Sequence, residues 1–173
     1  MLALGVVAGL AAAALCGADW ARLADVRWRL WPLVLVGFVL QLVLYGQLEG
    51  RTLPDLPYAP ALYVASNLLV LASLGANARV RGALVMLLGG TLNLAAIAAN
   101  GGQMPSLHRG MTDATPLHWL ADWIELPFVP RREFSVGDVL LAVGAAVVVY
   151  TLARRQAPAE ARAGSAEDAV PSR

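Results

Sequence analysis

Residues 120–144, LADWIELPFVPRREFSVGDVLLAVG, join a polar loop to a long apolar segment and place two carboxylates, Asp122 and Asp138, near its start. Most of the remaining sequence is apolar as well. A charge next to hydrocarbon costs free energy, so acidic side chains at such a boundary cap a helix, face water or take part in chemistry. The stretch therefore predicts a membrane protein with an acidic region at one membrane surface.

The composition favours a bilayer environment. Hydrophobic residues make up 58% of the 173 residues and charged residues only 14%, and the mean hydropathy is +0.62. The surface of a soluble domain needs more charge than this. The net charge of +1 gives no basis for binding nucleic acid. One cysteine, Cys16, excludes an intrachain disulfide and a Cys-x-x-Cys metal site.

Five apolar stretches each approach the roughly 20 residues that a helix needs to cross about 30 Å of hydrocarbon. They cover residues 2–18, 30–47, 60–77, 82–100 and 136–153. We therefore expect an all-α, polytopic transmembrane bundle of five spans, forming a single membrane domain over residues 1–155. Residues 156–173 are rich in Ala, Glu, Pro and Ser, which predicts a disordered cytoplasmic tail.

The arginines predict the orientation, because short cytoplasmic loops are enriched in basic residues. The first connection, the third connection and the start of the tail carry Arg22, Arg27, Arg29, Arg79, Arg81, Arg154 and Arg155. The second connection has only Arg51, beside Glu49 and Asp55. These counts predict an outside N-terminus, a cytoplasmic C-terminus and an outside connection over residues 101–136. All 13 basic residues are Arg, which indicates a GC-rich bacterial genome and hence the bacterial plasma membrane.

A short interfacial amphipathic helix is expected in the first connection. Trp20, Leu23 and Leu30 recur there at helical spacing, with Arg22 and Asp25 on the opposite face. Such a helix lies in the membrane surface with its apolar face buried in the headgroup region. Its expected role is to anchor the connection.

A second amphipathic helix is expected over residues 116–126 of the outer connection. It would carry His118, Asp122 and Glu125 on the face opposite Leu120 and Ile124. One His and two carboxylates can ligate a metal, but the sequence has no second His or Cys cluster beside them. We therefore expect a solvated face, with no metal and no cofactor.

Amides within the apolar stretches are expected to face other helices, since an unpaired amide in hydrocarbon is costly. Gly89, Asn93, Ala96 and Asn100 follow one helical stripe and predict a small-residue face with two amides turned to a neighbour. Hydrogen bonds between helices contribute about 0.6 kcal/mol each. The alternative is that Asn100 and Asn67 line a cavity open to the outer face.

The fourth and fifth spans both have recognisable end signals. Asn100, Gly101 and Gly102 permit a left-handed cap at the end of the fourth span, before Pro105; the exposed glycine backbone is also a place where a substrate could approach. Ser135 precedes Asp138 by three residues and predicts a capping box at the start of the fifth span. The candidate binding residues at these two ends are Asn67, Asn93, Asn100, Gly101, Gly102 and Ser135.

Four separated motifs resemble those of one protein family. The motifs are ADWARLADVRWRLWPLVLVGFVLQ, NLAAIAANGGQMP, TPLHWLADWIELP and FSVGDVLLAVG. Their order resembles an uncharacterised bacterial family of five-span membrane proteins known only as a domain of unknown function. The resemblance covers residues 1–153. It implies a topology and no activity.

A more local resemblance, over residues 93–144, is to lipoprotein signal peptidases, which are four-span membrane aspartyl proteases. The LADWI and FSVGD segments hold acids, Asp122 and Asp138, that match the two catalytic acids of that family. Ser135 and Gly137 replace the family's Asn and Ala in the second motif. The resemblance implies that Asp122 and Asp138 are catalytic: neighbouring carboxylates share a proton, so one activates water while the other protonates the leaving group.

Three functions follow from these observations. The first is an integral inner-membrane protein of unassigned biochemical role, with a polar site at the outer ends of the fourth and fifth spans. The second is an aspartyl peptidase-like hydrolase that acts on a membrane-embedded substrate through Asp122 and Asp138. The third is a non-enzymatic membrane partner or lipid-binding subunit. The lipid bilayer is an expected partner in all three, and nucleic acid in none.

Overall fold

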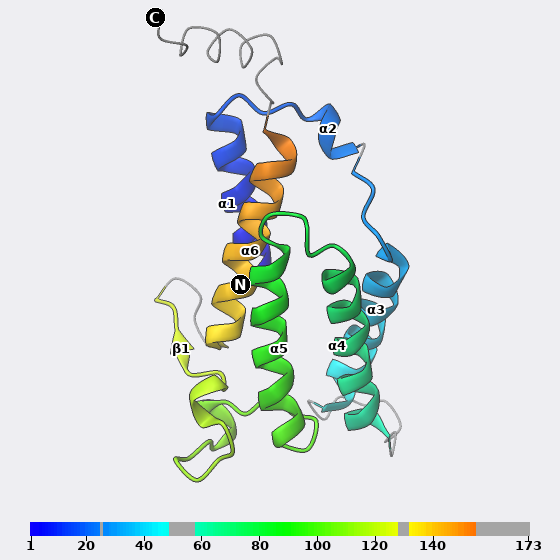
Figure 1. Ribbon diagram of the computed structural model, residues 1–173. Helices are drawn as coiled ribbons and strands as arrows, with labels where there is room; N and C mark the ends of the chain where they lie inside the picture. The colour runs from blue at the N-terminus through cyan, green and yellow to red at the C-terminus, as the bar shows by residue number, and fades with distance from the viewer. Residues whose placement is uncertain (25, 49–57, 128–131, 155–173) are drawn as a thin grey trace, which may run out of the picture.

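The computed structural model describes residues 1–24, 26–48, 58–127 and 132–154. Five long helices occupy the five apolar stretches (Figure 1): α1 (Leu2–Leu15), α3 (Trp31–Leu48), α4 (Ala59–Ala76), α5 (Ala83–Ala99) and α6 (Val136–Ala153). The connections contain the short helix α2 (Ala21–Ala24), the 3-10 helices η1 (Leu107–Arg109) and η2 (His118–Leu120), and an antiparallel pair, β1 (Ile124–Glu125) and β2 (Glu133–Phe134). The predicted tail, residues 156–173, and residues 49–57 lie outside the described residues.

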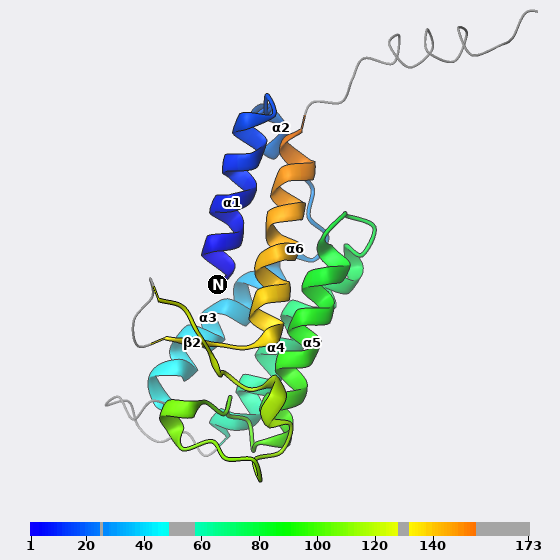
Figure 2. The same cartoon turned by 90° about the vertical axis from the view of Figure 1, so that its left-hand side faces the viewer.

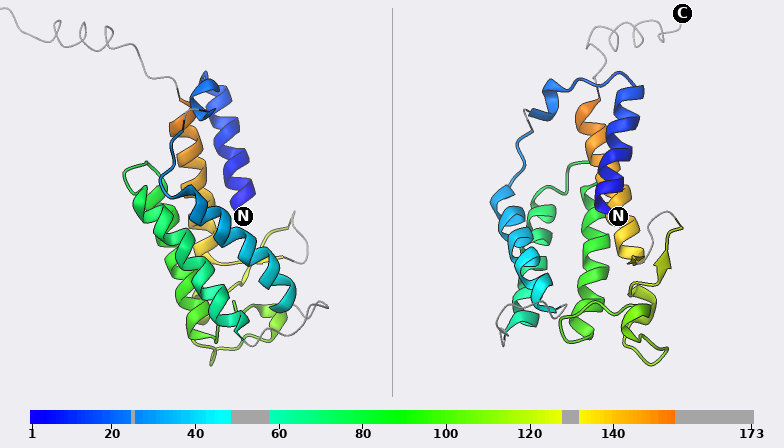
Figure 3. Two further views of the ribbon diagram at one scale, coloured as in Figure 1. Left: turned by 90° about the vertical axis from the view of Figure 1, so that its right-hand side faces the viewer. Right: turned by 180° about the vertical axis from the view of Figure 1, so that it is seen from behind.

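The long helices are arranged in a row. α1 packs on α6, α6 on α5, α5 on α4, and α4 on α3. From behind, α3 and α4 lie on one side of the molecule and α1 and α6 on the other (Figure 3). The first two long helices of the sequence are therefore separated, and α5 joins the two sides.

Glycines allow α6 to approach both of its neighbours closely. A Cβ atom on Gly9 of α1 would lie 2.6 Å from the Ala146 carbonyl oxygen, and one on Gly89 of α5 would lie 2.5 Å from the Gly137 carbonyl oxygen. Neither position has room for a side chain. Small residues that let backbones meet are typical of helix contacts in membranes.

Two of the long helices, α4 and α6, are long and apolar enough to cross a membrane, and α1, residues 31–44 of α3, and α5 are shorter apolar helices. Apolar side chains cover their outward faces as well as their contacts; Val7, Leu42, Leu68 and Leu88 are all more than half exposed. A helix that is apolar all round belongs inside a protein core or a bilayer. The surface of this bundle therefore has the character expected in a membrane.

The arginine-bearing connections lie at one end of the bundle. Arg22 Nη1 donates to the Arg154 carbonyl oxygen at 3.0 Å, next to the end of α6. Further along, the Arg29 amide donates to Asn77 Oδ1 at 3.0 Å, at the end of α4. The first connection thus runs from the end of α6 to the end of α4, where the short loop with Arg79 and Arg81 begins.

The amphipathic helix expected in the first connection is limited to the four residues of α2. Trp28 leaves the helical path to donate from Nε1 to Ser73 Oγ at 2.9 Å. Leu30 then adopts a left-handed conformation, with φ of 57°. Contacts with α4 therefore override the helical spacing in this segment.

The second expected amphipathic helix, over residues 116–126, is wrong. Only one 3-10 turn, η2, forms there. The chain then extends, because the Asp122 amide donates to the Pro105 carbonyl oxygen at 3.0 Å and its own carbonyl accepts from the Leu107 amide at 3.3 Å. Ile124 next pairs with Phe134 in the β hairpin. The connection between α5 and α6 is thus a small β-containing layer at the end of the bundle opposite α2 (Figure 2), and the fold is mostly helical with one short strand pair in its described part.

Candidate functional site

The start of α6 is the centre of the polar region. Ser135 Oγ accepts a hydrogen bond from the Asp138 amide at 3.0 Å, and the Ser135 amide donates to Asp138 Oδ2 at 3.4 Å. These two bonds confirm the predicted capping box. They satisfy backbone groups that would otherwise be unpaired at a buried helix end.

Asn93 of α5 connects to this cap across the helix contact. Its Nδ2 donates to Asp138 Oδ1 at 3.0 Å, and its Oδ1 accepts from the fully buried Ser135 hydroxyl at 2.7 Å. The amide lies against Gly137, where any side chain would collide with it. The prediction that Asn93 hydrogen-bonds to a neighbouring helix is therefore confirmed, and both carboxylate oxygens of Asp138 accept hydrogen bonds.

Asp122 has a different environment. The pKa of its carboxyl is raised from 3.8 to about 7, mainly by burial and also by the charges of Asp138 and Glu133, whereas the charge of Arg109 lowers it. Its Oδ1 is buried without a hydrogen-bond partner. The structure thus brings Asp122 into the electrostatic range of Asp138, although the two acids lie far apart in sequence. One carboxylate is fixed by donors, and the other has an unused oxygen and a raised pKa.

The other candidate residues, at the end of α5, have structural partners. Asn100 donates from Nδ2 to the carbonyl oxygens of Ala96, at 2.8 Å, and Pro116, at 2.9 Å. Gly101 and Gly102 have φ of 67° and 85°, which confirms the left-handed cap after α5. Gly102 also packs against Pro60, where a Cβ would have no space.

A cavity of about 650 Å³ lies between α3, α4, α5 and α6. Its wall is mainly apolar and includes Leu35, Phe38, Val70, Leu71, Leu74 and Leu141. Leu35 and Phe38 are 55% and 40% exposed, so the cavity reaches the outside of the bundle. The sequence does not indicate the apolar wall of this cavity, because the five helices follow no pattern that specifies which of them leave a space.

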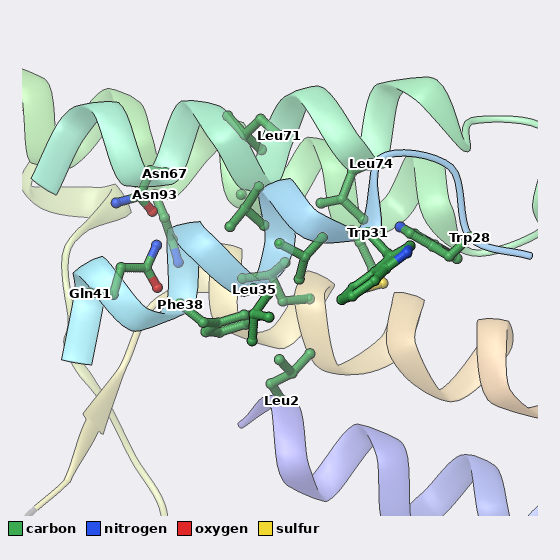
Figure 4. A pocket seen from close by; sticks show the side chains of 15 residues that line it. Leu2, Trp28, Trp31, Leu35, Phe38, Gln41, Asn67, Leu71, Leu74 and Asn93 are labelled. Atoms are coloured by element: carbon green, nitrogen blue, oxygen red, sulfur yellow. The ribbon is translucent and has the colours of Figure 1, made fainter. Parts of the chain in front are cut away.

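The polar side chains of the cavity gather at one end. Figure 4 shows Gln41, Asn67 and Asn93 together there, with Trp28 and Trp31 at the opposite end. Asn67, expected to line a cavity, does so, whereas Asn100 is not among the lining residues. Asn93 belongs both to this cavity and to the cap of α6. It therefore joins the apolar cavity to the acidic region.

A second polar cluster lies in the connection between α5 and α6. His108, Glu125 and Glu133 each offer a ligand atom, and these atoms all lie within 4.8 Å of one another. The helical spacing of the sequence predicts a different group, His118, Asp122 and Glu125, but the helix that would bring these three residues together does not form. Because His108, Glu125 and Glu133 come from η1, β1 and β2, no sequence spacing indicates this cluster.

Comparison with known proteins identifies a family and no activity. The model of a family of unknown function, DUF5317, matches residues 25–107 and 106–150. No curated protein matches the chain, and no solved structure does so either. The family match covers most of the chain and agrees with the resemblance to an uncharacterised family. The chain therefore belongs to DUF5317, a family of unknown function.

Proposed function

We propose that this protein is a five-span integral membrane protein that binds an amphiphile, with the apolar chain in the cavity and the polar group against Gln41 and Asn67. The observation that carries the proposal is the 650 Å³ apolar cavity with amides at one end. This volume is within the roughly 300–1,000 Å³ of small-molecule sites, which combine apolar walls with a few polar groups.

The arginines give the proposed orientation. The end with Arg22, Arg29 and Arg154 is cytoplasmic under the positive-inside rule. The amide end of the cavity is nearer the outer connection, so the polar group of the amphiphile lies toward the outer leaflet of the bacterial plasma membrane. The N-terminus is then outside and the C-terminus inside.

The amides provide the selectivity in this proposal. The transfer of an apolar chain from the bilayer into an apolar cavity gains little free energy, since lipid tails are as apolar as Leu. Among the residues that the structure describes, none hydrogen-bonds to the Gln41 side chain, and Asn67 uses its Nδ2 on the Tyr63 carbonyl oxygen of its own helix. An unpaired amide near hydrocarbon is costly. A hydroxyl, phosphate or amide group of a bound amphiphile removes this cost.

The test is to identify what co-purifies with the protein. Protein extracted in lipid nanodiscs should hold one class of amphiphile enriched over the surrounding membrane lipids, measured by mass spectrometry of the extract. Gln41→Leu and Asn67→Leu should lose this enrichment. Thr91→Val, which changes an exposed polar residue of α5 bonded to its own helix, should retain it. A wild-type extract with the composition of the bulk membrane would contradict the proposal.

The acidic pair supports a second candidate function, hydrolysis of a membrane-embedded substrate. The specific observation is the pKa of Asp122, raised to about 7 beside the charge of Asp138. A carboxyl with this pKa is suited to proton transfer near neutral pH, while Asp138 beside it activates water. Asp122→Asn should then leave the enriched amphiphile or a membrane peptide uncleaved with the fold intact. Equal turnover in wild type and Asp122→Asn would exclude the pair from catalysis.

A further inference from the structure

The cluster of His108, Glu125 and Glu133 is held by the backbone of the outer connection. Glu125 and Glu133 face each other as partners in the β1–β2 pair. The His108 amide donates to Glu133 Oε2 at 3.3 Å, and His108 Nδ1 lies 2.9 Å from Glu133 Oε1. Two strands and one turn therefore bring an imidazole and two carboxylates together.

Glu133 is the unusual member of this cluster. Its side chain is only 4% exposed, whereas that of His108 is 58% exposed. Its Oε1 accepts no hydrogen bond, despite the short distance to His108 Nδ1. Two lone-pair atoms at this distance repel each other unless a proton or a cation lies between them. A buried carboxylate oxygen without a donor is costly.

The pairing of Glu125 with Glu133 adds to this cost. Like charges directly opposite each other on neighbouring strands destabilise the pair. A divalent cation bound between them neutralises both carboxylates and supplies the missing partner of Glu133 Oε1. A proton shared with His108 would partner Glu133 alone, whereas one cation neutralises both carboxylates.

We propose that His108, Glu125 and Glu133 bind one divalent metal ion of the zinc class. Zinc accepts imidazole nitrogen together with carboxylate oxygen, and three protein ligands leave a position for water. Calcium and magnesium prefer oxygen-only ligand sets, which the imidazole does not fit. The bound ion ties η1 to the hairpin that leads directly into the cap of α6.

The proposal is independent of the cavity, although Glu133 also acts on the nearby Asp122 carboxyl through its charge. The metal ligands belong to the outer connection, and none of them lines the cavity. The ion fixes the positions of β1 and β2 relative to η1. Its loss loosens this layer without changing the helix contacts that form the cavity, so the two proposals give separate readouts.

The experiment uses the full chain, without an affinity tag, in nanodiscs after treatment with a chelator. Titration with Zn²⁺, followed by calorimetry and by metal analysis, should give one ion per chain and a higher melting temperature. His108→Ala, at an exposed side chain, and Glu133→Gln should each weaken Zn²⁺ binding by more than the roughly 10-fold that loss of a supporting partner costs. His118→Ala, the other histidine of the same connection, should bind Zn²⁺ as the wild type does.

Three results would overturn the proposal. The first is a wild-type protein that binds no Zn²⁺. The second is Zn²⁺ binding that His108→Ala leaves unchanged, a result that does not depend on how well Glu133→Gln folds. The third is full displacement of Zn²⁺ by equimolar Ca²⁺ or Mg²⁺, which would assign the site to a hard cation.

Discussion

Helix α5 has two contrasting sides. Toward α6, Gly89 meets Gly137 without intervening side chains, and Asn93 is hydrogen-bonded to the cap of α6. Toward α3, the same helix borders a cavity in which Gln41 and Asn67 present amides. On the side toward α6, the polar groups are hydrogen-bonded within the protein. On the side toward α3, the cavity presents amide groups to a ligand. The difference separates the contact that stabilises the fold from the space that we propose carries the function.

The largest expected effect on stability comes from a substitution in the close contact between α5 and α6. Gly137→Ala places a methyl group against the Asn93 amide, so we expect a loss of about 2–3 kcal/mol in the free energy of unfolding, as for overpacked cores. Gly75→Ala is the matched control, because its Cβ would meet no atom. Denaturant unfolding in detergent measures both. Equal stability of the two variants would show that α5 and α6 do not meet this closely.

Substituting the amides should distinguish the two sides of α5. Asn93→Leu removes two interhelical hydrogen bonds and leaves the buried Ser135 hydroxyl without its acceptor, so it should cost about 1–2 kcal/mol. Gln41→Leu removes no hydrogen bond within the described part of the chain and should leave stability unchanged or raise it. Thermal unfolding in ligand-free detergent compares the two variants. A larger loss for Gln41→Leu would invert our assignment of the two sides.

A smaller effect concerns the cap that Asn93 contacts. Ser135→Ala should reduce stability by about 1 kcal/mol, because the Asp138 amide loses its acceptor. Ser135→Thr keeps a hydroxyl group and is the matched control. The same unfolding measurement applies. If Ser135→Ala were as stable as the wild type, the capping box would not contribute to the contact between α5 and α6.

The pH dependence of stability tests the environment of Asp122 separately from the contact between α5 and α6. Its pKa is about 7 in the folded protein and 3.8 as the ordinary value, so the folded state holds more protons between these limits. Stability should therefore fall as the pH rises from 3.8 toward 7. Asp122→Asn should reduce this slope, whereas Asp113→Asn, at an exposed position in the same connection, should not. Melting temperatures measured in chelator across this range provide the test, and an identical slope in Asp122→Asn would contradict it.

The sequence predicted those features of α5 and α6 that depend on local patterns. The apolar stretches predicted the extents of the long helices, the Ser135-x-x-Asp138 spacing predicted the cap, and the helical stripe predicted that Asn93 faces a neighbouring helix. These features depend on neighbours within one or two turns. They are therefore visible without the tertiary structure.

The structure of the connection between α5 and α6 could not be predicted in this way. Its helical spacing over residues 116–126 is overridden by backbone pairing of Asp122 with the segment around Pro105 and Leu107. The pairing of Glu125 with Glu133 is likewise between separate segments. Such contacts are decided by the packing of the connection on the bundle, and no periodicity in the sequence indicates them. The proximity of His108, Glu125 and Glu133 cannot be predicted from the sequence for the same reason.

The most direct test of the central claim is to fill the cavity. Val70→Trp places an indole in the cavity, while Leu68→Trp, at a side chain of α4 that is 52% exposed and does not line it, adds the same group outside. Native mass spectrometry of the nanodisc-extracted proteins measures the bound amphiphile. We expect it to be lost from Val70→Trp and retained by Leu68→Trp and the wild type. Equal retention by both variants would contradict the proposal that this cavity is the binding site.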